Sequence, residues 1–80
     1  MTDASFSLTS LLPGQEATII AIRAEEALHH RLAAMGFRVG RALQLVRRGA
    51  FHGPLHVRVG STDVIIRRSD ADAIEIAATD

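Results

Sequence analysis

The sequence predicts a small, mostly-β domain of the α+β class, built as a barrel of about five strands with a helix over residues 24–35 inserted between the first two strands. Several segments alternate apolar with polar residues, which is typical of half-buried strands. A single segment has the i, i+4, i+7 apolar spacing of an amphipathic helix. The chain has only 80 residues, so its short strands should enclose a core by curling into a barrel rather than by forming a flat sheet.

The first predicted elements are a helical turn and a strand. Ser7 can cap a short turn that carries Leu8, and Pro13-Gly14 ends it. The segment QEATIIAI follows, and its β-branched, mostly apolar character predicts a strand over residues 15–22. The unbroken apolar run in this segment indicates that the strand is buried on both faces near its end.

The predicted helix buries a narrow apolar stripe. Leu28, Leu32 and Met35 recur at the spacing that places them on one helix face. Gly36 is positioned to end the helix in the left-handed conformation, which glycine adopts at low cost. Phe37 can then fold back onto the last helical turn. All five residues therefore have a structural interpretation.

The C-terminal half is predicted to consist mainly of strands. Val39-Gly40 suits a turn, and Gly60-Ser61 suits a two-residue hairpin with glycine at its first central position. Ser69 and Asp72 resemble a capping box at the start of a short helical turn. The alternating segments predict strands over residues 42–48, 55–59, 62–67 and 74–76.

One domain is expected, because the sequence contains no repeat and no boundary signal. It should cover residues 7–77, between flexible termini at residues 1–6 and 78–80. Cysteine is absent, which fits a reducing compartment. The N-terminus lacks the apolar run of a signal peptide, and no apolar stretch approaches the roughly 20 residues that cross a bilayer. We therefore expect a cytoplasmic protein without membrane insertion.

The residue types argue against an enzyme and against nucleic-acid binding. The chain has no cysteine nucleophile, no lysine for a Schiff base and no glycine-rich phosphate loop. Nine arginines balance nine acidic residues, whereas dedicated nucleic-acid binders are strongly basic. Stacking on bases needs aromatic side chains, and the chain has three Phe and neither Trp nor Tyr.

Histidines are the only candidate metal ligands apart from carboxylates. His52 and His56 flank a Gly-Pro turn and could approach each other, while His29 lies on the predicted helix. Zinc takes four ligands in structural sites and at least three protein ligands in catalytic ones, so two loop histidines are too few. Either these are exposed polar residues, or they contribute to an adventitious or bridging zinc ion shared between two chains, which would produce a homodimer. No cofactor is expected to be required.

A small barrel without catalytic residues is best interpreted as an adaptor for a protein partner. The loop at residues 49–54 and the hairpin over residues 55–67 would form its rims, because loops on a rigid scaffold carry recognition. Phe51 in that loop either contacts a partner or folds back on the end of the barrel. Arginine is the charged residue most favoured at interfaces, which makes Arg58 and Arg67 candidate contacts.

The order of these motifs resembles the FeoA family over about residues 7–77. The segments that carry the resemblance are SLTSLLPGQEATIIAI, RLAAMGFRVG and LQLVRRGAFHGPLHVRVGSTDVIIRRSDADAIEI. The centre of the pattern consists of Arg31, Leu32, Met35, Gly36, Phe37 and Gly40. Met35 stands where the family usually has Leu, and this exchange conserves volume.

The resemblance implies an SH3-like barrel, similar also to the C-terminal domain of iron-dependent repressors of the DtxR type. It implies a regulatory role in bacterial ferrous iron uptake, in which the protein binds the cytoplasmic region of the transporter FeoB and its G-protein domain. The alternative is a metal-responsive module that binds a transition metal through surface histidines. Arg31 belongs to the family pattern, and we expect it to contact a carbonyl or carboxylate and to help bind the partner.

Overall fold

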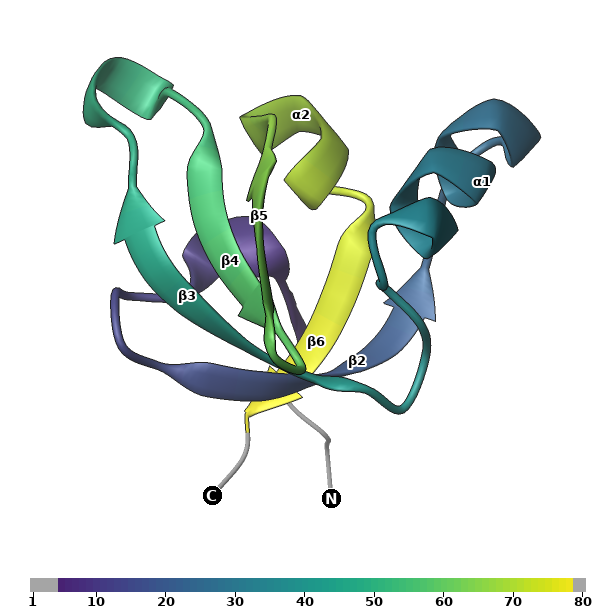
Figure 1. The fold of residues 1–80 in the computed structure, drawn as a ribbon, viewed down its shortest axis with the longest axis horizontal. Helices are drawn as coiled ribbons and strands as arrows, with labels where there is room; N and C mark the ends of the chain where they lie inside the picture. Colours follow the sequence, from purple (N-terminus) through teal and green to yellow (C-terminus); the bar gives the residue numbers. More distant parts are fainter. Residues whose placement is uncertain (1–4, 79–80) are drawn as a thin grey trace.

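The structure, a computed structural model, describes residues 5–78, and its strands form one antiparallel sheet (Figure 1). The strand order in the sheet is β1-β6-β2-β3-β4-β5. The elements in chain order are β1 (Ser5–Ser7), the 3-10 turn η1 (Leu8–Ser10), β2 (Glu16–Ile22), α1 (Glu26–Ala34), β3 (Ala42–Arg48), the 3-10 turn η2 (Ala50–His52), β4 (Leu55–Val59), β5 (Thr62–Ile66), α2 (Arg68–Ala71) and β6 (Ile74–Ala78). The five predicted strands are therefore confirmed, and β1 is a sixth.

Strand β1 lies where the sequence predicts a flexible terminus. Ser5 pairs with Ala77 and Phe6 with Ile76, so β1 occupies the edge of β6 that β2 leaves open. A chain end becomes ordered when a sheet holds it in this way, but three residues are too few to show a strand pattern in the sequence. The predicted C-terminal tail is also shorter than expected, because β6 continues to Ala78. The rest of both predicted tails lies outside the described residues.

The sheet curls around an aliphatic core. Irregularities in register between Ile19 and Ala21 of β2, and between Leu45 and Arg47 of β3, bend these long strands. The strands thereby direct their apolar faces to one interior. The buried residues are Leu8, Leu11, Ala17, Ile19, Leu32, Phe37, Leu43, Leu45, Leu55, Val57, Val59, Ile66, Ala71, Ile74 and Ile76. Phe37 is the only aromatic side chain among them, since Phe6 and Phe51 are exposed.

Helix α1 is anchored by one buried side chain. Leu32 is fully buried, whereas Leu28 and Met35 pack against the core while remaining half-exposed. The predicted stripe is therefore present but narrow. The helix begins at Glu26 rather than at residue 24, because Glu25 has the extended backbone of an N-cap.

The end of α1 confirms the predicted role of Gly36. Gly36 has φ +101°, its N–H donates to the Ala33 carbonyl, and the N–H of Phe37 donates to the Leu32 carbonyl at 3.0 Å. These two bonds form the Schellman motif that satisfies carbonyls at a helix end. Phe37 is thereby turned into the core, where it is 1% exposed.

Gly36→Ala is expected to destabilise the fold by about 1–2 kcal/mol, because an L side chain at this φ is strained. A Cβ at Gly36 would meet Val59 Cγ1 only at 3.8 Å, an ordinary contact, so the cost is conformational rather than steric. Urea unfolding of the variant measures it. A synthetic chain with D-alanine at this position is the control, and equal destabilisation by both alanine forms would contradict this reason.

The predicted capping box at the start of α2 is wrong. Arg67 occupies the N-cap position without a side-chain bond, and Asp72 lies at the other end of the helix. The Asp72 carboxylate instead accepts hydrogen bonds from Ser7 Oγ at 3.1 Å and Thr9 Oγ1 at 2.9 Å. The tertiary fold offers two hydroxyl donors that local sequence does not show. Ser7 also caps η1, as predicted, by accepting the N–H of Thr9.

Three short helical elements gather at one end of the barrel. Figure 1 shows η2, α2 and α1 side by side at the top, while β1 begins and β6 ends at the bottom. The hairpin turn at Gly60 also lies at the bottom end, since it is at the far end of β4 and β5 from Leu55 and Ile66. In residues 5–78, no helix is long and apolar enough to cross a membrane.

Candidate partner-binding surface

The loop between β3 and β4 has a tight, glycine-dependent shape. The N–H of Gly49 donates to the Pro54 carbonyl at 2.8 Å, and the N–H of Gly53 donates to the Ala50 carbonyl at 3.0 Å. A Cβ placed on Gly49 would lie 2.6 Å from the Pro54 oxygen, which is too close for any other residue. These two hydrogen bonds therefore close the loop on itself and fix the backbone at its tip.

Phe51 projects from the tip of this loop. Phe51 is 98% exposed, so it does not fold back on the end of the barrel, and its contact with a partner stays a prediction. Its backbone is left-handed, with φ 56° and ψ 46°, and the next residue, His52, has φ 61°. This conformation costs an L residue about 1–2 kcal/mol, and a bulky residue rarely adopts it. The exposed ring gains no packing that would offset this cost.

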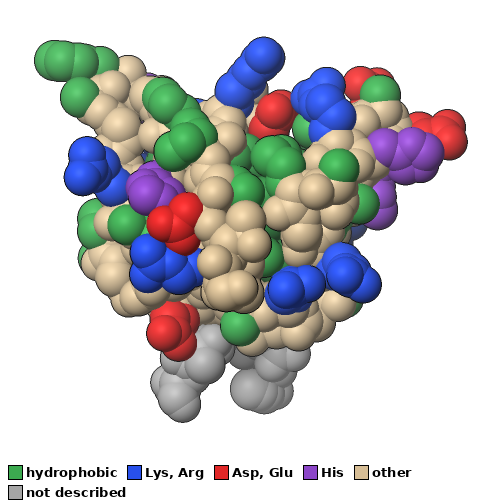
Figure 2. Space-filling view, in the orientation of Figure 1, with side chains coloured by type: hydrophobic (Ala, Val, Ile, Leu, Met, Phe, Trp, Pro, Cys, Tyr) green, Lys and Arg blue, Asp and Glu red, His purple; other side chains and the backbone are tan. Residues whose placement is uncertain are grey.

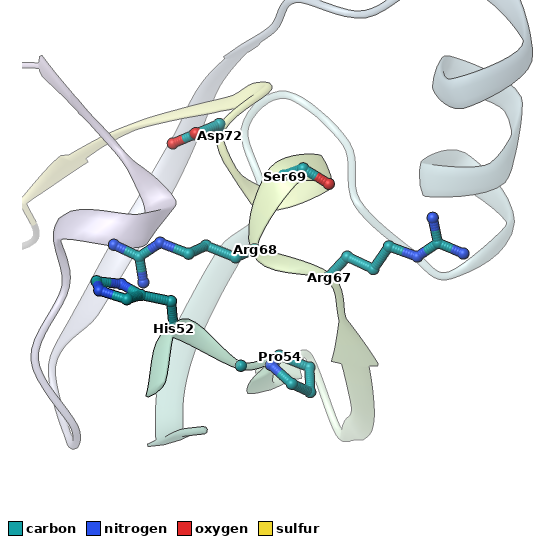
Figure 3. A pocket seen from close by; sticks show the side chains of 7 residues that line it. His52, Pro54, Arg67, Arg68, Ser69 and Asp72 are labelled. Atoms are coloured by element: carbon teal, nitrogen blue, oxygen red, sulfur yellow. The ribbon is translucent and has the colours of Figure 1, made fainter. Parts of the chain in front are cut away.

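A cleft of about 550 Å³ opens between the loop and α2 (Figure 3). We call it the rim cleft. Its lining residues are His52, Gly53, Pro54, Arg67, Arg68, Ser69 and Asp72. In the close view, Arg68 extends toward His52, and Arg67 extends in the opposite direction. One wall of the cleft thus carries the arginines at the start of α2, and the loop that contains Phe51 forms the wall opposite.

The rim cleft carries an excess of positive charge. Within the described chain, the guanidinium groups of Arg67 and Arg68 form no hydrogen bond or ion pair. Asp72 is the cleft's one carboxylate, and two hydroxyl groups already bind it. Figure 2 shows the same end of the molecule, with an apolar protrusion at the β3–β4 connection and with both arginine and acidic side chains along the top.

Arg31 makes the expected contact with a carboxylate. Its Nη2 lies 3.4 Å from Oδ2 of Asp70, so the pair joins α1 to α2. A second cleft, of about 360 Å³, lies between α1 and β5 and is lined by Arg31, Met35, Ile65 and Arg67 among others. Arg31 and Arg67 therefore line the same cleft. The Arg31 side chain is exposed, and such a pair contributes only about 0–1 kcal/mol to stability.

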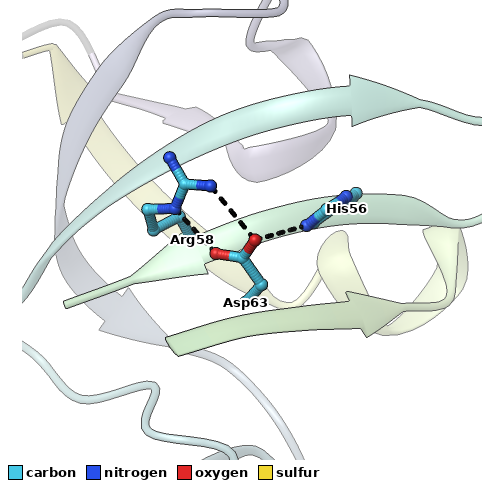
Figure 4. Close-up of polar contacts among 3 residues, drawn as sticks. All are labelled: His56, Arg58 and Asp63. Atoms are coloured by element: carbon cyan, nitrogen blue, oxygen red, sulfur yellow. Dashed lines mark hydrogen bonds and ion pairs between the residues drawn. The ribbon is translucent and has the colours of Figure 1, made fainter. Parts of the chain in front are cut away.

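Arg58 lies away from this end of the molecule. Its Nε and Nη2 donate to the two carboxylate oxygens of Asp63 at 2.7 and 3.1 Å, and His56 Nε2 is 3.0 Å from Asp63 Oδ2 (Figure 4). These three residues lie on the neighbouring strands β4 and β5. Of the four arginine and phenylalanine residues predicted to bind a partner, Phe51, Arg67 and Arg31 share one end of the barrel, whereas Arg58 is occupied by Asp63.

The candidate metal ligands do not come together within one chain. His56 is bound to Asp63, His29 is exposed on α1, and His52 lines the rim cleft. No group of three or more His, Cys, Asp or Glu side chains in residues 5–78 could hold a metal ion. A zinc ion shared between two chains stays a prediction.

The carboxyl group of Asp63 should give stability a measurable pH dependence. Hydrogen bonds from Arg58 and then His56 lower the pKa of Asp63 from 3.8 to about 2. Since the folded pKa is below the unfolded one, these contacts stabilise the fold above pH 3.8 and are lost as the pH falls through about 2. Urea unfolding between pH 5 and 2 should therefore show a weaker acid dependence for Asp63→Asn. Glu16→Gln, which removes a carboxylate that forms no ion pair in the described chain, is the control. Identical slopes for Asp63→Asn and the wild type would contradict this assignment.

Arg68 is the cleft residue that the sequence analysis missed. The Arg67-Arg68 pair at the end of a predicted strand is the signal that could have found it, although the sequence analysis names only Arg67 as a candidate contact. The sequence does not show that the 49–54 loop faces these arginines across a cleft, because that juxtaposition depends on the curl of β3 and β4.

Comparison with known proteins identifies relatives of the chain. The sequence model of the FeoA domain matches residues 6–78. A fusion of Fe(2+) transport protein A with the Fe(2+) transporter FeoB, from Porphyromonas gingivalis, is 29% identical over 69 residues. That match covers 86% of this chain but only 8% of the fusion protein.

Two solved structures share the architecture. FeoA of Stenotrophomonas maltophilia, an SH3-domain protein in complex with zinc, is 28% identical, with a TM-score of 0.77 over 89% of this chain and 88% of that one. A manganese-dependent transcriptional repressor has a TM-score of 0.89 and 22% identity, and the match covers 99% of this chain and 44% of the repressor. The first confirms the expected SH3-like barrel, and the second shows likeness of fold alone.

Proposed function

The chain belongs to the FeoA family, and we propose that it acts by binding the cytoplasmic region of the ferrous iron transporter FeoB. In this role it regulates transport or nucleotide turnover by the partner and carries out no reaction itself. Members of this family are small accessory proteins of iron transport, and the family is not a known enzyme family. The proposal places the protein in the cytoplasm.

The projecting Phe51 is the observation that carries this proposal. An exposed aromatic on a strained backbone has a cost to the fold and no benefit to it, so its benefit must arise in a complex. Aromatic and arginine side chains are enriched at protein interfaces and dominate their binding energies. Phe51 belongs to the loop that forms one wall of the rim cleft, and the unpaired Arg67 and Arg68 line the same cleft, which gives this end of the barrel that composition.

The fusion relative supports FeoB as the partner. In that protein a FeoA part and a FeoB part belong to one polypeptide, so the two act in the same place. In this chain, β1 begins and β6 ends at the end of the barrel opposite Phe51 and the rim cleft. A chain connection at that end would leave the rim cleft free to face a partner.

Binding to full-length FeoB of the same organism, purified in lipid nanodiscs, tests the proposal. Calorimetry would be carried out without nucleotide, with GDP and with a GTP analogue, each with metal chelated and then restored. Saturable binding that survives chelation is the expected result. The isolated cytoplasmic part of FeoB would then show whether the contact lies there. Absence of binding in every nucleotide state, with and without metal, would overturn the adaptor role.

A metal-responsive role is the second candidate, and the zinc complex of the S. maltophilia protein is the observation that favours it. The described residues of this chain offer no site with three ligands, so zinc would have to bridge histidines of two chains. Zinc titration by calorimetry, with light scattering to follow dimer formation, would be performed on a dilute, tag-free sample. No heat above buffer and no change in mass would exclude this role.

A further inference from the structure

We infer that the rim cleft binds an acidic segment of a protein partner, with Phe51 inserted as an apolar anchor beside it. The inference rests on the proposed function, since it states which surface of this chain would meet FeoB and what chemistry that partner would present.

Charge selects an acidic occupant. Arg67 and Arg68 have no carboxylate partner in the described part of the chain, whereas Arg23, Arg31 and Arg58 each form an ion pair there. Arginine binds carboxylates through two parallel hydrogen bonds, so each free guanidinium can receive one side chain. The single acid of the cleft, Asp72, is already bound by Ser7 and Thr9.

The anchor, Phe51, is next to the cleft along the chain. Phe51 directly precedes His52, which lines the cleft, and both have left-handed backbones fixed by the closed loop. The backbone of Phe51 therefore adjoins a residue that lines the cleft, and this closed loop has few backbone conformations to lose on binding. Preorganised anchors of this kind raise affinity because less entropy is lost in the complex.

The shape and composition favour a protein segment over other anions. The opening is wide and about 550 Å³ in volume, and Gly53 and Pro54 add uncharged surface to its lining. A single phosphate or carboxylate would contact only part of it. Oligonucleotides bind where several aromatics stack on bases, and here one phenylalanine stands alone in a chain of zero net charge.

The main test compares two double variants that remove equal charge. Arg67→Gln with Arg68→Gln alters the cleft, while Arg38→Gln with Arg41→Gln alters exposed arginines outside it. Affinity for full-length FeoB would be measured at several salt concentrations, after circular dichroism has shown that each variant is folded. We expect the first pair to weaken binding about tenfold and to flatten the salt dependence, and the second to change it less than about twofold. Equal effects of the two pairs would overturn the inference.

A second experiment, with a peptide in place of FeoB, tests the acidic-segment site independently of the proposed function. The probe is a 12-residue peptide of alternating Glu, Asp and Leu, and a peptide with Lys in place of the acids is its control. Amide chemical shifts of the whole protein should move at residues 51–53 and 67–72 with the acidic peptide, and not in the variant that lacks Arg67 and Arg68. If FeoB fails to bind but these shifts appear, the proposed partner is wrong and the acidic site stands. Shifts elsewhere only, or tighter binding of a single-stranded DNA 12-mer, would overturn the site.

Discussion

Phe51→Asn is expected to raise the free energy of unfolding while weakening the binding of FeoB. Phe51 is 98% exposed, so truncating the ring removes no packing. Asparagine tolerates the left-handed backbone at φ 56° better than phenylalanine does. A gain of about 0.5–1 kcal/mol should follow, because it recovers part of the roughly 1–2 kcal/mol that this conformation costs. If Phe51 is an anchor, its loss should cost about 2 kcal/mol of binding energy, or roughly 30-fold in affinity.

Urea unfolding and calorimetry with full-length FeoB measure these two opposite effects on one sample. Val39→Asn is the matched control, because Val39 is also an exposed apolar residue and lies outside the rim cleft. The control should leave FeoB affinity unchanged. A Phe51→Asn protein that is less stable than the wild type would show that the ring packs on the barrel in solution. Unchanged affinity would remove Phe51 from the interface.

Leu32→Ala is expected to have the largest effect on stability, a loss of about 2–5 kcal/mol. Leu32 is the only buried residue of α1, and its backbone carbonyl accepts the N–H of Phe37, which fixes the turn into β3. An 80-residue domain has a total stability of about 4–12 kcal/mol, so this one change removes a large share of it. Helix α1 should then open locally, and the Arg31–Asp70 contact would be lost with it.

Hydrogen exchange by NMR would locate the effect of Leu32→Ala. Amides of α1 should lose protection by a larger factor than those of β2 and β3. Leu28→Ala is the control, since Leu28 is half-buried on the same helix and its truncation leaves a smaller cavity. Equal destabilisation by Leu28→Ala and Leu32→Ala would mean that the helix is held by its whole stripe rather than by one residue.

These two predictions describe opposite uses of an apolar side chain. Leu32 holds an element to the core, and its removal weakens the fold. Phe51 weakens the fold where it stands, and its removal should weaken only the complex. The difference follows from burial and backbone conformation together, since neither residue type alone indicates which role it has.

The sequence alone determined the local features of this protein. Alternating apolar residues placed β3, β4, β5 and β6, a β-branched apolar run placed β2, and Gly36 after the Leu28–Met35 stripe placed the end of α1. Strand and helix periods depend on residues that are neighbours along the chain, so a single sequence contains them. The need for a carboxylate or carbonyl partner at Arg31 was also visible, because a charged side chain at the edge of a buried stripe must find one.

Only the tertiary structure decided which distant groups meet. Arg48 was one of several arginines along a strand, yet its Nη1 donates to the carbonyls of Thr9 and Leu11 at 2.8 and 2.6 Å and thereby holds η1 against β3. Asp72 binds Ser7 and Thr9 across more than 60 residues in the same way. These contacts, like the rim cleft between the Phe51 loop and Arg67, arise because the bulged strands curl and bring separate segments to one end. Curvature is a property of the whole sheet, and no local pattern in the sequence specifies it.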